Sequence, residues 1–219
     1  MNTMTKIFTD VWVWVVITAI WIMITFTTVA SIVLIDKVNN RSIDDVTLVG
    51  NYLVRVPNGH GNGVALKDVF LTSAHVVNNG GPPDDFVWTI DGIEGSGVIS
   101  YGESGTDTDY ALLDLQFPDY AEVYCGPLKR NQQIFYKGEL LIRGNPINLY
   151  YSGRILETQV INNVMFDGTI LADIPVVSGM SGGPIYNRDG QVIGIMGGIL
   201  EMGSWSVAFI IPLPKELCE

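Results

Sequence analysis

Many short apolar runs, each bounded by Gly, Asn, Asp or Pro, fill this chain from residue 46 to residue 211. Several of them alternate apolar and polar residues, which is the period of a half-buried β-strand. No amphipathic helical pattern of useful length lies between them. This succession predicts an all-β fold, a sandwich or a barrel. The expected strands are 46–56, 63–66, 69–72, 86–90, 97–101 and 110–115, followed by 134–136, 140–143, 148–161, 169–174, 184–186, 192–196 and 206–211.

An uncharged apolar segment, residues 11–35, precedes the strand region and contains neither Gly nor Pro. As a helix it would be about 37 Å long at ~1.5 Å per residue, enough to cross a bilayer core of ~30 Å. A cleaved signal peptide has a shorter apolar core of about 7–15 residues. We therefore predict a single transmembrane anchor, with residues 1–10 as its N-terminal flank and 36–45 as a polar linker. An uncleaved or late-cleaved signal sequence is the alternative.

The charges beside this segment bear on its orientation in the membrane. Lys6 precedes the segment, whereas Lys37, Arg41 and Arg55 follow it. By the positive-inside rule this slightly favours a cytoplasmic position for the region after the anchor. The margin is only two or three charges, so the sequence leaves the side of the membrane open.

The net charge of −11 argues against nucleic acid as a partner. The stretch from Asp68 to Leu128 contains acidic residues but no Lys or Arg. We expect it to form an acidic face exposed to solvent. The only cysteines are Cys125 and Cys218. Because Cys218 lies at a terminus, where chains fray, we expect two free thiols, although one bridge is possible. No Cys or His cluster has metal-ligand spacing, and no cofactor is expected.

The segment Ser178-Gly179-Met180-Ser181-Gly182-Gly183-Pro184 holds a serine between glycines. Glycines tolerate φ > 0 and allow a sharp bend that points successive N–H groups at one spot. The N–H groups of Gly179 and Ser181 could then form an oxyanion hole, and Ser181 could act as a nucleophile.

A base and an acid precede this serine in the chain. His75 follows an apolar strand in the segment Phe70-Leu71-Thr72-Ser73-Ala74-His75, and Asp109 precedes another. Asp107 is the main rival for the acid, and Asp114 is a weaker one because it falls inside the strand. A histidine that is oriented by a carboxylate can take the proton of a serine hydroxyl. The order His, Asp, Ser differs from that of subtilisins and of α/β-hydrolases.

With these three motifs, the chain resembles trypsin-like serine peptidases of the chymotrypsin fold, in the style of the HtrA-type and viral members. The likeness extends over roughly residues 46–214 and includes Gly61-Asn62-Gly63-Val64-Ala65-Leu66 before the histidine strand and a closing strand at residues 206–212. It implies two six-stranded antiparallel β-barrels, at about residues 46–120 and 132–213. It also implies His75, Asp109 and Ser181 as the catalytic residues.

The resemblance also bears on activation and specificity. Met180 stands where trypsin-type zymogens carry an Asp that pairs with a new N-terminal amine, so no activating cleavage is expected. Pro175 stands at the position that is Asp in trypsin, which argues against a Lys or Arg preference through that device. A small or medium apolar residue is the default, while Asp173 leaves basic residues open. The implied pocket is lined by Pro175, Val176, Ile195, Met196, Gly197 and Ala208.

The sequence therefore predicts a membrane-anchored serine endopeptidase within residues 46–219. Its partners would be a polypeptide substrate and the membrane, through residues 11–35. A viral or phage processing enzyme and a bacterial envelope peptidase both agree with this description. The alternative is a catalytically inactive, peptidase-like binding module at a membrane.

Overall fold

A computed structural model describes residue 23 and residues 46–78, 82–102, 108–158, 168–202 and 205–219. By its internal contacts the chain divides into Met1–Arg41 and Ser42–Glu219, and every element below belongs to the second unit. Among the described residues, no helix has the length and apolar character needed to cross a membrane. Apart from Met23, the anchor predicted at residues 11–35 lies outside the described residues.

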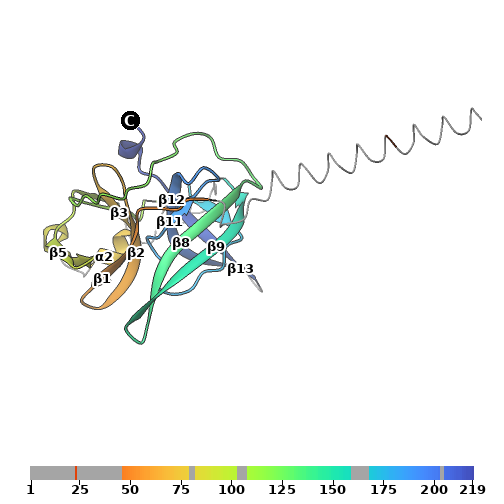
Figure 1. Ribbon diagram of the computed structural model, residues 1–219. Coiled ribbons are helices and arrows are strands. Elements are labelled where there is room, and N and C mark those ends of the chain that lie inside the picture. The colour runs from red at the N-terminus through yellow and green to blue at the C-terminus, as the bar shows by residue number, and fades with distance from the viewer. Residues whose placement is uncertain (1–22, 24–45, 79–81, 103–107, 159–167, 203–204) are drawn as a thin grey trace, which may run out of the picture. The chain divides into compact units, whose positions relative to one another are not determined.

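The first half of the domain is a seven-stranded antiparallel sheet in the order β5-β4-β1-β2-β3-β7-β6 (Figure 1). A short helix, α2, follows β3 directly, and a 3-10 helix, η2, precedes β4. The elements are β1 (Asn51–Val56), β2 (Gly59–Ala65), β3 (Phe70–Thr72), α2 (Ala74–Val77), η2 (Pro83–Asp85), β4 (Val87–Ile90), β5 (Ile93–Ser96), β6 (Ser100–Tyr101) and β7 (Ala111–Leu113).

This sheet differs from the closed six-stranded barrel that the sequence predicts. Its two edges, β5 and β6, follow one another in the chain with only residues 97–99 between them. Within that link, the Gly97 N–H bonds to Phe86 beside β4 and the Ile99 N–H bonds to Leu112 in β7. The chain therefore crosses from one edge to the other, but β6 pairs only with β7 and not with β5, so the sheet stays open.

The second half is the predicted barrel, closed in the order β10-β13-β12-β11-β8-β9. The two strands expected at residues 134–136 and 140–143 are one continuous strand, β8, which ends at Ile142 and pairs with β9 along its whole length. Arg143 and Gly144, both with positive φ, make the tight turn between them, as a two-residue hairpin requires. The elements are β8 (Gln133–Ile142), β9 (Asn145–Glu157), β10 (Ile170–Ala172), β11 (Pro184–Tyr186), β12 (Val192–Met202), β13 (Trp205–Pro212) and the 3-10 helix η3 (Lys215–Leu217).

Three apolar clusters hold these elements together. One lies within the first sheet and includes Phe70 and Trp88, and another fills the barrel and includes Tyr136 and Met180. The third joins the two halves, because it combines Leu71 of β3 with side chains of the barrel strands. Alternate residues of β12 and β13 point into the barrel or into this shared cluster, as strand geometry dictates.

The cysteines are paired, so the expectation of two free thiols is wrong. Cys125 and Cys218 form a disulfide across Cα atoms 5.6 Å apart. The C-terminal end does not fray, because Leu217 packs against the shared cluster. Glu216 also accepts hydrogen bonds from the hydroxyls of Ser100 and Tyr110, at 3.2 and 3.1 Å. These contacts bring Cys218 to Cys125 in the link between the two halves.

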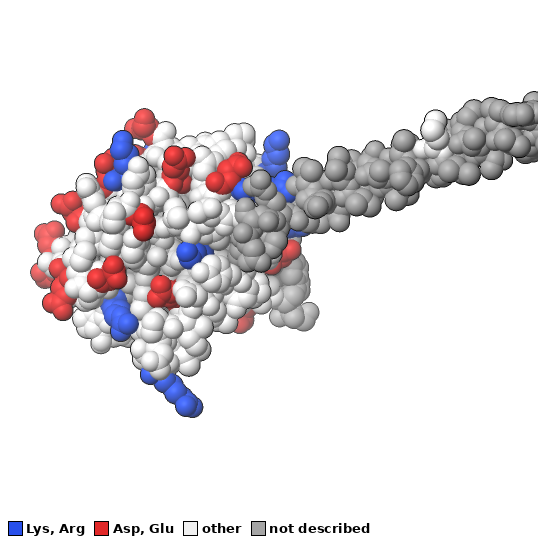
Figure 2. Space-filling view, viewed as in Figure 1, with Lys and Arg blue, Asp and Glu red and all other residues white. Residues whose placement is uncertain are grey.

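Acidic side chains gather over the first sheet, at the left of the view in Figure 2. They belong to the stretch between Asp68 and Leu128, which carries no Lys or Arg. The predicted acidic face is therefore a property of the first half of the domain.

Candidate active site

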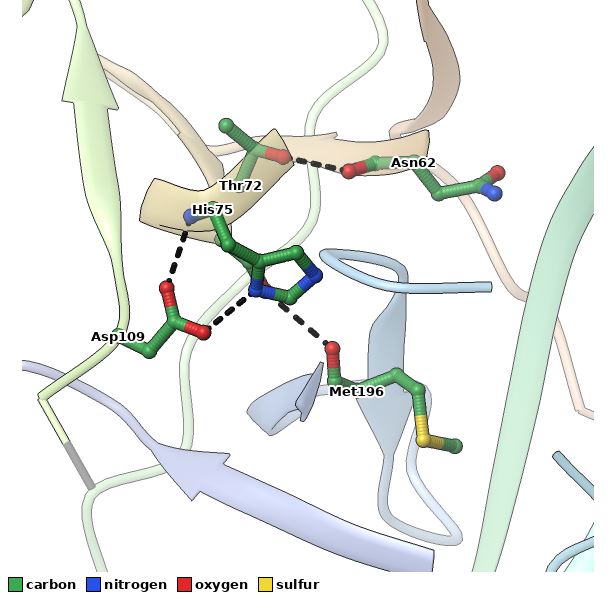
Figure 3. A network of polar contacts seen from close by, with 6 residues as sticks. Asn62, Thr72, His75, Asp109 and Met196 are labelled. Atoms are coloured by element: carbon green, nitrogen blue, oxygen red, sulfur yellow. Dashed lines mark hydrogen bonds and ion pairs between the residues drawn. The ribbon is translucent and has the colours of Figure 1, made fainter. Parts of the chain in front are cut away.

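His75 and Asp109 are held together by two contacts (Figure 3). His75 lies in α2, immediately after β3, and its Nδ1 is 2.5 Å from Asp109 Oδ2. The backbone N–H of His75 donates to the other carboxylate oxygen, Oδ1, at 2.9 Å. Since a carboxylate only accepts, Nδ1 carries the proton of the neutral ring and Nε2 has a free lone pair. The Asp109 side chain is 0% exposed and that of His75 is 34% exposed, so the imidazole alone reaches solvent.

Of the three candidate acids, the structure places Asp109 against the imidazole. Asp114 is exposed just after β7. Asp107 lies outside the described residues. A carboxylate without solvent requires charge-assisted partners, and both of the bonds described for Asp109 come from His75.

Ser181 lies in the bend before β11, and two N–H groups of this bend have no acceptor among the described residues. Met180, Gly182 and Gly183 donate to the carbonyls of Val177, Met196 and Met180, at 3.2, 2.8 and 3.1 Å. Within the described part of the chain, the N–H groups of Gly179 and Ser181 donate to nothing. These are the two donors that the sequence predicts for an oxyanion hole.

The backbone of the bend needs glycine at its two corners. Gly179 and Gly182 have φ angles of +96° and +79°, which L side chains rarely adopt. A Cβ on Gly179 would lie 2.7 Å from His60 Nε2 and 2.8 Å from Leu140 Cδ2. The left-handed backbone therefore strains any side chain here, and a Cβ would also displace the ends of the His60 and Leu140 side chains.

The serine bend and the histidine turn meet although they come from opposite halves of the domain. A Cβ on Gly182 would lie 2.9 Å from the backbone nitrogen of Ser73, two residues before His75. Ser73 Oγ and the Gly182 N–H also donate to the same carbonyl, that of Met196, at 3.3 and 2.8 Å. Ser181 directly precedes Gly182 in the chain, so it lies beside the turn that carries His75.

Met180 is buried and anchors the bend from inside the barrel. Its side chain is 0% exposed, and its sulfur accepts the N–H of Val177 at 3.2 Å. A thioether packed in this way has no charge to pair with an amine.

The residues predicted for the specificity pocket do not share one environment. Val176 packs against the barrel cluster that contains Met196 and Ala208, whereas Ile195 points into the cluster between the halves. Pro175 is exposed and Gly197 is buried. The structure thus brings Val176, Met196 and Ala208 together and separates Ile195 from them.

Asp173, which could have favoured basic substrates, is engaged elsewhere. Its Oδ1 accepts the backbone N–H of Arg154, and the same oxygen lies 2.7 Å from where a Cβ on Gly153 would be. Both partners belong to β9, so the carboxylate is held at the barrel wall.

Two buried polar side chains that sequence reasoning passed over also contact the bend. Asn62 stands between the glycines of the quoted Gly61-Asn62-Gly63 motif, and its amide reaches Gly179. Tyr136 donates from its hydroxyl to the Met180 carbonyl. The glycines around Asn62 were the only sequence feature that drew attention to either residue. In the sequence, Tyr136 looks like an ordinary apolar residue of a strand.

No group of three or more His, Cys, Asp or Glu side chains is arranged to hold a metal ion in the described parts of the chain.

Comparison with known families decides the relationship. The model of the trypsin-like peptidase domain matches residues 59–195, which include His75, Asp109 and Ser181. The chain belongs to the trypsin-like peptidase family. A search of curated proteins returned no match to this peptidase.

Solved structures share the fold of this trypsin-like peptidase. The Rv3671c protease from M. tuberculosis in its active form matches with a TM-score of 0.54 and 19% identity, covering 75% of each chain. A human pathogenic astrovirus serine protease matches with a TM-score of 0.54 and 17% identity, covering 76% of this chain and 91% of its own. The HtrA-type protease AlgW, solved with a tripeptide, gives 0.54 and 20%, covering 77% and 57%. The trypsin-like peptidase is a serine endopeptidase, and its substrate is a polypeptide.

Proposed function

We propose that this serine endopeptidase cleaves peptide bonds through His75, Asp109 and Ser181. Ser181 Oγ attacks the scissile carbonyl carbon while His75 Nε2 takes its proton. The carbonyl oxygen becomes an oxyanion and accepts from the N–H groups of Gly179 and Ser181. His75 then gives the proton to the leaving amine, and the acyl-enzyme remains. Water, deprotonated by the same imidazole, attacks the acyl carbon; the bond to Ser181 Oγ breaks, His75 returns the proton to Oγ, and the acid product leaves.

One observation carries this proposal: Asp109 orients the imidazole, while two N–H groups of the serine bend have no acceptor in the described part of the chain. Asp109 holds Nδ1 and the backbone of His75 at once, which fixes the tautomer whose Nε2 is basic. The free N–H groups of Gly179 and Ser181 alternate with N–H groups that are bonded. One donor of this kind stabilises a transition state by about 3–4 kcal/mol.

Cleavage of a peptide library by the full-length chain tests the proposal. Ser181→Ala should lower turnover by about 10⁶-fold. Ser178→Ala, which changes an exposed serine in the same bend, serves as the matched control and should stay within a few-fold of the parent. Equal activity of the Ser181→Ala variant and the parent would refute the role of Ser181, and a folded parent that cleaves nothing would support the inactive binding module.

The proposal includes attachment to a membrane through residues 11–35, with the peptidase domain on an oxidising side. The apolar length of that segment supports an anchor. The Cys125–Cys218 disulfide supports the oxidising side, because such bonds persist mainly outside reducing compartments. This argument outweighs the small charge margin that favours the cytoplasm. An enzyme of a bacterial envelope, or one that processes viral or phage proteins, suits this placement.

A pair of reporters fused to the C-terminus tests the membrane side. Alkaline phosphatase, which needs disulfides, should be active in the fusion, and a fluorescent protein that folds only in the cytoplasm should be dark. The opposite pattern would place the domain in the cytoplasm and contradict the proposed side.

A further inference from the structure

The serine bend needs a rigid support, because its two free N–H groups must point outward before a substrate arrives. In trans peptide groups the C=O and N–H point in opposite directions. The direction of an N–H in the bend is therefore fixed by whatever holds the carbonyl of the same peptide group. Two of the carbonyls in the bend, those of Gly179 and Met180, are held by buried side chains.

Asn62 holds the first of these carbonyls, and the peptide group of that carbonyl carries the Met180 N–H, which donates to Val177. Its Nδ2 donates to the Gly179 carbonyl at 2.7 Å and to the Glu139 carbonyl at 2.8 Å. Its Oδ1 accepts the Glu139 N–H at 2.7 Å. The partners fix which end of the amide is nitrogen, since carbonyls only accept and N–H groups only donate. The Asn62 side chain is 0% exposed, so none of these bonds competes with bulk water.

The position of Asn62 makes it a connector of three segments. It belongs to β2 of the first sheet, and its side-chain amide bonds to both the carbonyl and the N–H of Glu139 in β8. The same amide also bonds to Gly179 in the serine bend. Its backbone N–H also donates to the Ser181 carbonyl at 2.7 Å. The bend is therefore tied to both halves of the domain through one residue.

Tyr136 holds the second carbonyl. Its hydroxyl donates to the Met180 carbonyl at 3.2 Å, and the N–H of Gly183 donates to the same oxygen at 3.1 Å. This carbonyl shares its peptide group with the Ser181 N–H, which must then point the other way. Burial raises the pKa of Tyr136 above its usual range, so the hydroxyl keeps its proton and remains a donor.

We propose that Tyr136 and Asn62 are positioning residues for the oxyanion donors of the uncut chain. Tyr136 fixes the peptide group that carries the Ser181 N–H, and Asn62 fixes the peptide groups on either side of it, through the Gly179 and Ser181 carbonyls. This inference rests on the proposed function. In the absence of a charged group at Met180, these two neutral hydrogen bonds take the place of an ion pair formed on activation. The site is then formed as soon as the domain folds.

The test uses two variants and a fluorophosphonate probe, whose phosphoryl oxygen also occupies the oxyanion hole. Asn62→Asp keeps the shape and the acceptor for Glu139 but removes both donors. Tyr136→Phe removes only the hydroxyl. Asn187→Asp is the control, because Asn187 is also buried and bonds to Asp189 and Gln191 in a turn before β12.

The labelling rate and the final labelled fraction of the full-length chain are measured separately. Loss of one oxyanion donor costs about 10²–10³-fold, so partial misdirection should slow labelling about 10- to 100-fold in either variant, with the final fraction unchanged. A merely structural role would instead lower the labelled fraction and leave the rate of the remaining molecules alone. The Asn187→Asp variant should keep the parental rate.

Parental labelling rates in both Asn62→Asp and Tyr136→Phe would overturn the inference while leaving the proposed function intact. A reduced labelled fraction at the parental rate in both would also overturn it. If the parent itself is not labelled, the proposed function fails first, and the inference falls with it. Should Asn62→Asp not fold, the Tyr136→Phe result alone decides.

Discussion

Gly182 and Gly144 have nearly the same left-handed backbone, with φ angles of +79° and +83°, but very different surroundings. A Cβ on Gly182 would lie 2.2 Å from the Asn62 carbonyl oxygen and 2.4 Å from Thr72 Oγ1. A Cβ on Gly144, at the tip of the β8–β9 hairpin, would meet nothing within 4 Å. Alanine at either site therefore has the same backbone strain, and only Gly182→Ala adds a collision with fixed atoms.

The strain of a left-handed L residue is about 1–2 kcal/mol, and both variants should lose that much unfolding free energy. The collision adds about 1–3 kcal/mol for Gly182→Ala, because the backbone of β2 must move. We expect losses of about 1–2 kcal/mol for Gly144→Ala and about 2–5 kcal/mol for Gly182→Ala. The gain from a stiffer unfolded chain is shared by both and cancels in the comparison.

Urea unfolding followed by Trp fluorescence measures the two losses, and fluorophosphonate labelling measures the site. Trp88 is buried in the first sheet and should report the transition. Gly144→Ala should label at the parental rate, and Gly182→Ala should label much more slowly because Ser181 is its neighbour. Equal stability of the two variants would refute the packing described for the junction of the serine bend with β2.

Three further predictions follow from other contacts. Asp109→Asn should lower kcat by about 10⁴-fold with little change in the fold, because an amide favours the wrong imidazole tautomer. A loss of tenfold or less would contradict this prediction. Cys218→Ser should lower the unfolding free energy by up to about 4–5 kcal/mol, since the disulfide with Cys125 spans a sequence separation of 93; unchanged urea unfolding would contradict it. Burial raises the pKa values of Tyr136 and Tyr186 above the ordinary 10.0, so the unfolded chain releases these protons first. Stability should then fall above about pH 10 by about 1.4 kcal/mol per pH unit for each tyrosine, and Tyr186→Phe should reduce the slope in alkaline unfolding curves, whereas an equal slope would contradict the burial of that hydroxyl.

The parts of the site that depend on local sequence could be predicted. The serine bend and the histidine turn are short segments whose glycines and small residues are needed by their own backbone, so Ser181 and His75 stand out in the sequence. Asp109 was separable from Asp114 by its place before the strand. The strands of the second half followed from their apolar runs and turns, whereas their closure into a barrel followed from the resemblance to trypsin-like peptidases.

The parts that depend on distant contacts could not be predicted. Asn62 bonds to Glu139 and Gly179, which are far from it in the sequence, and its neighbours in the chain do not indicate these bonds. The Cys125–Cys218 disulfide depends on how the C-terminal 3-10 helix packs. The first sheet stays open because β5 and β6 do not pair with each other, and that depends on how two strands meet in space, not on either segment's own sequence.

Mapping the residue modified by a fluorophosphonate in the full-length, uncut chain tests the central claim most directly. Mass spectrometry of the labelled chain should find the adduct on Ser181 at close to one per molecule, with none in Ser181→Ala and a strongly slowed reaction in His75→Ala. An unlabelled parent, an adduct on another residue, or labelling only after cleavage of the chain would contradict the account.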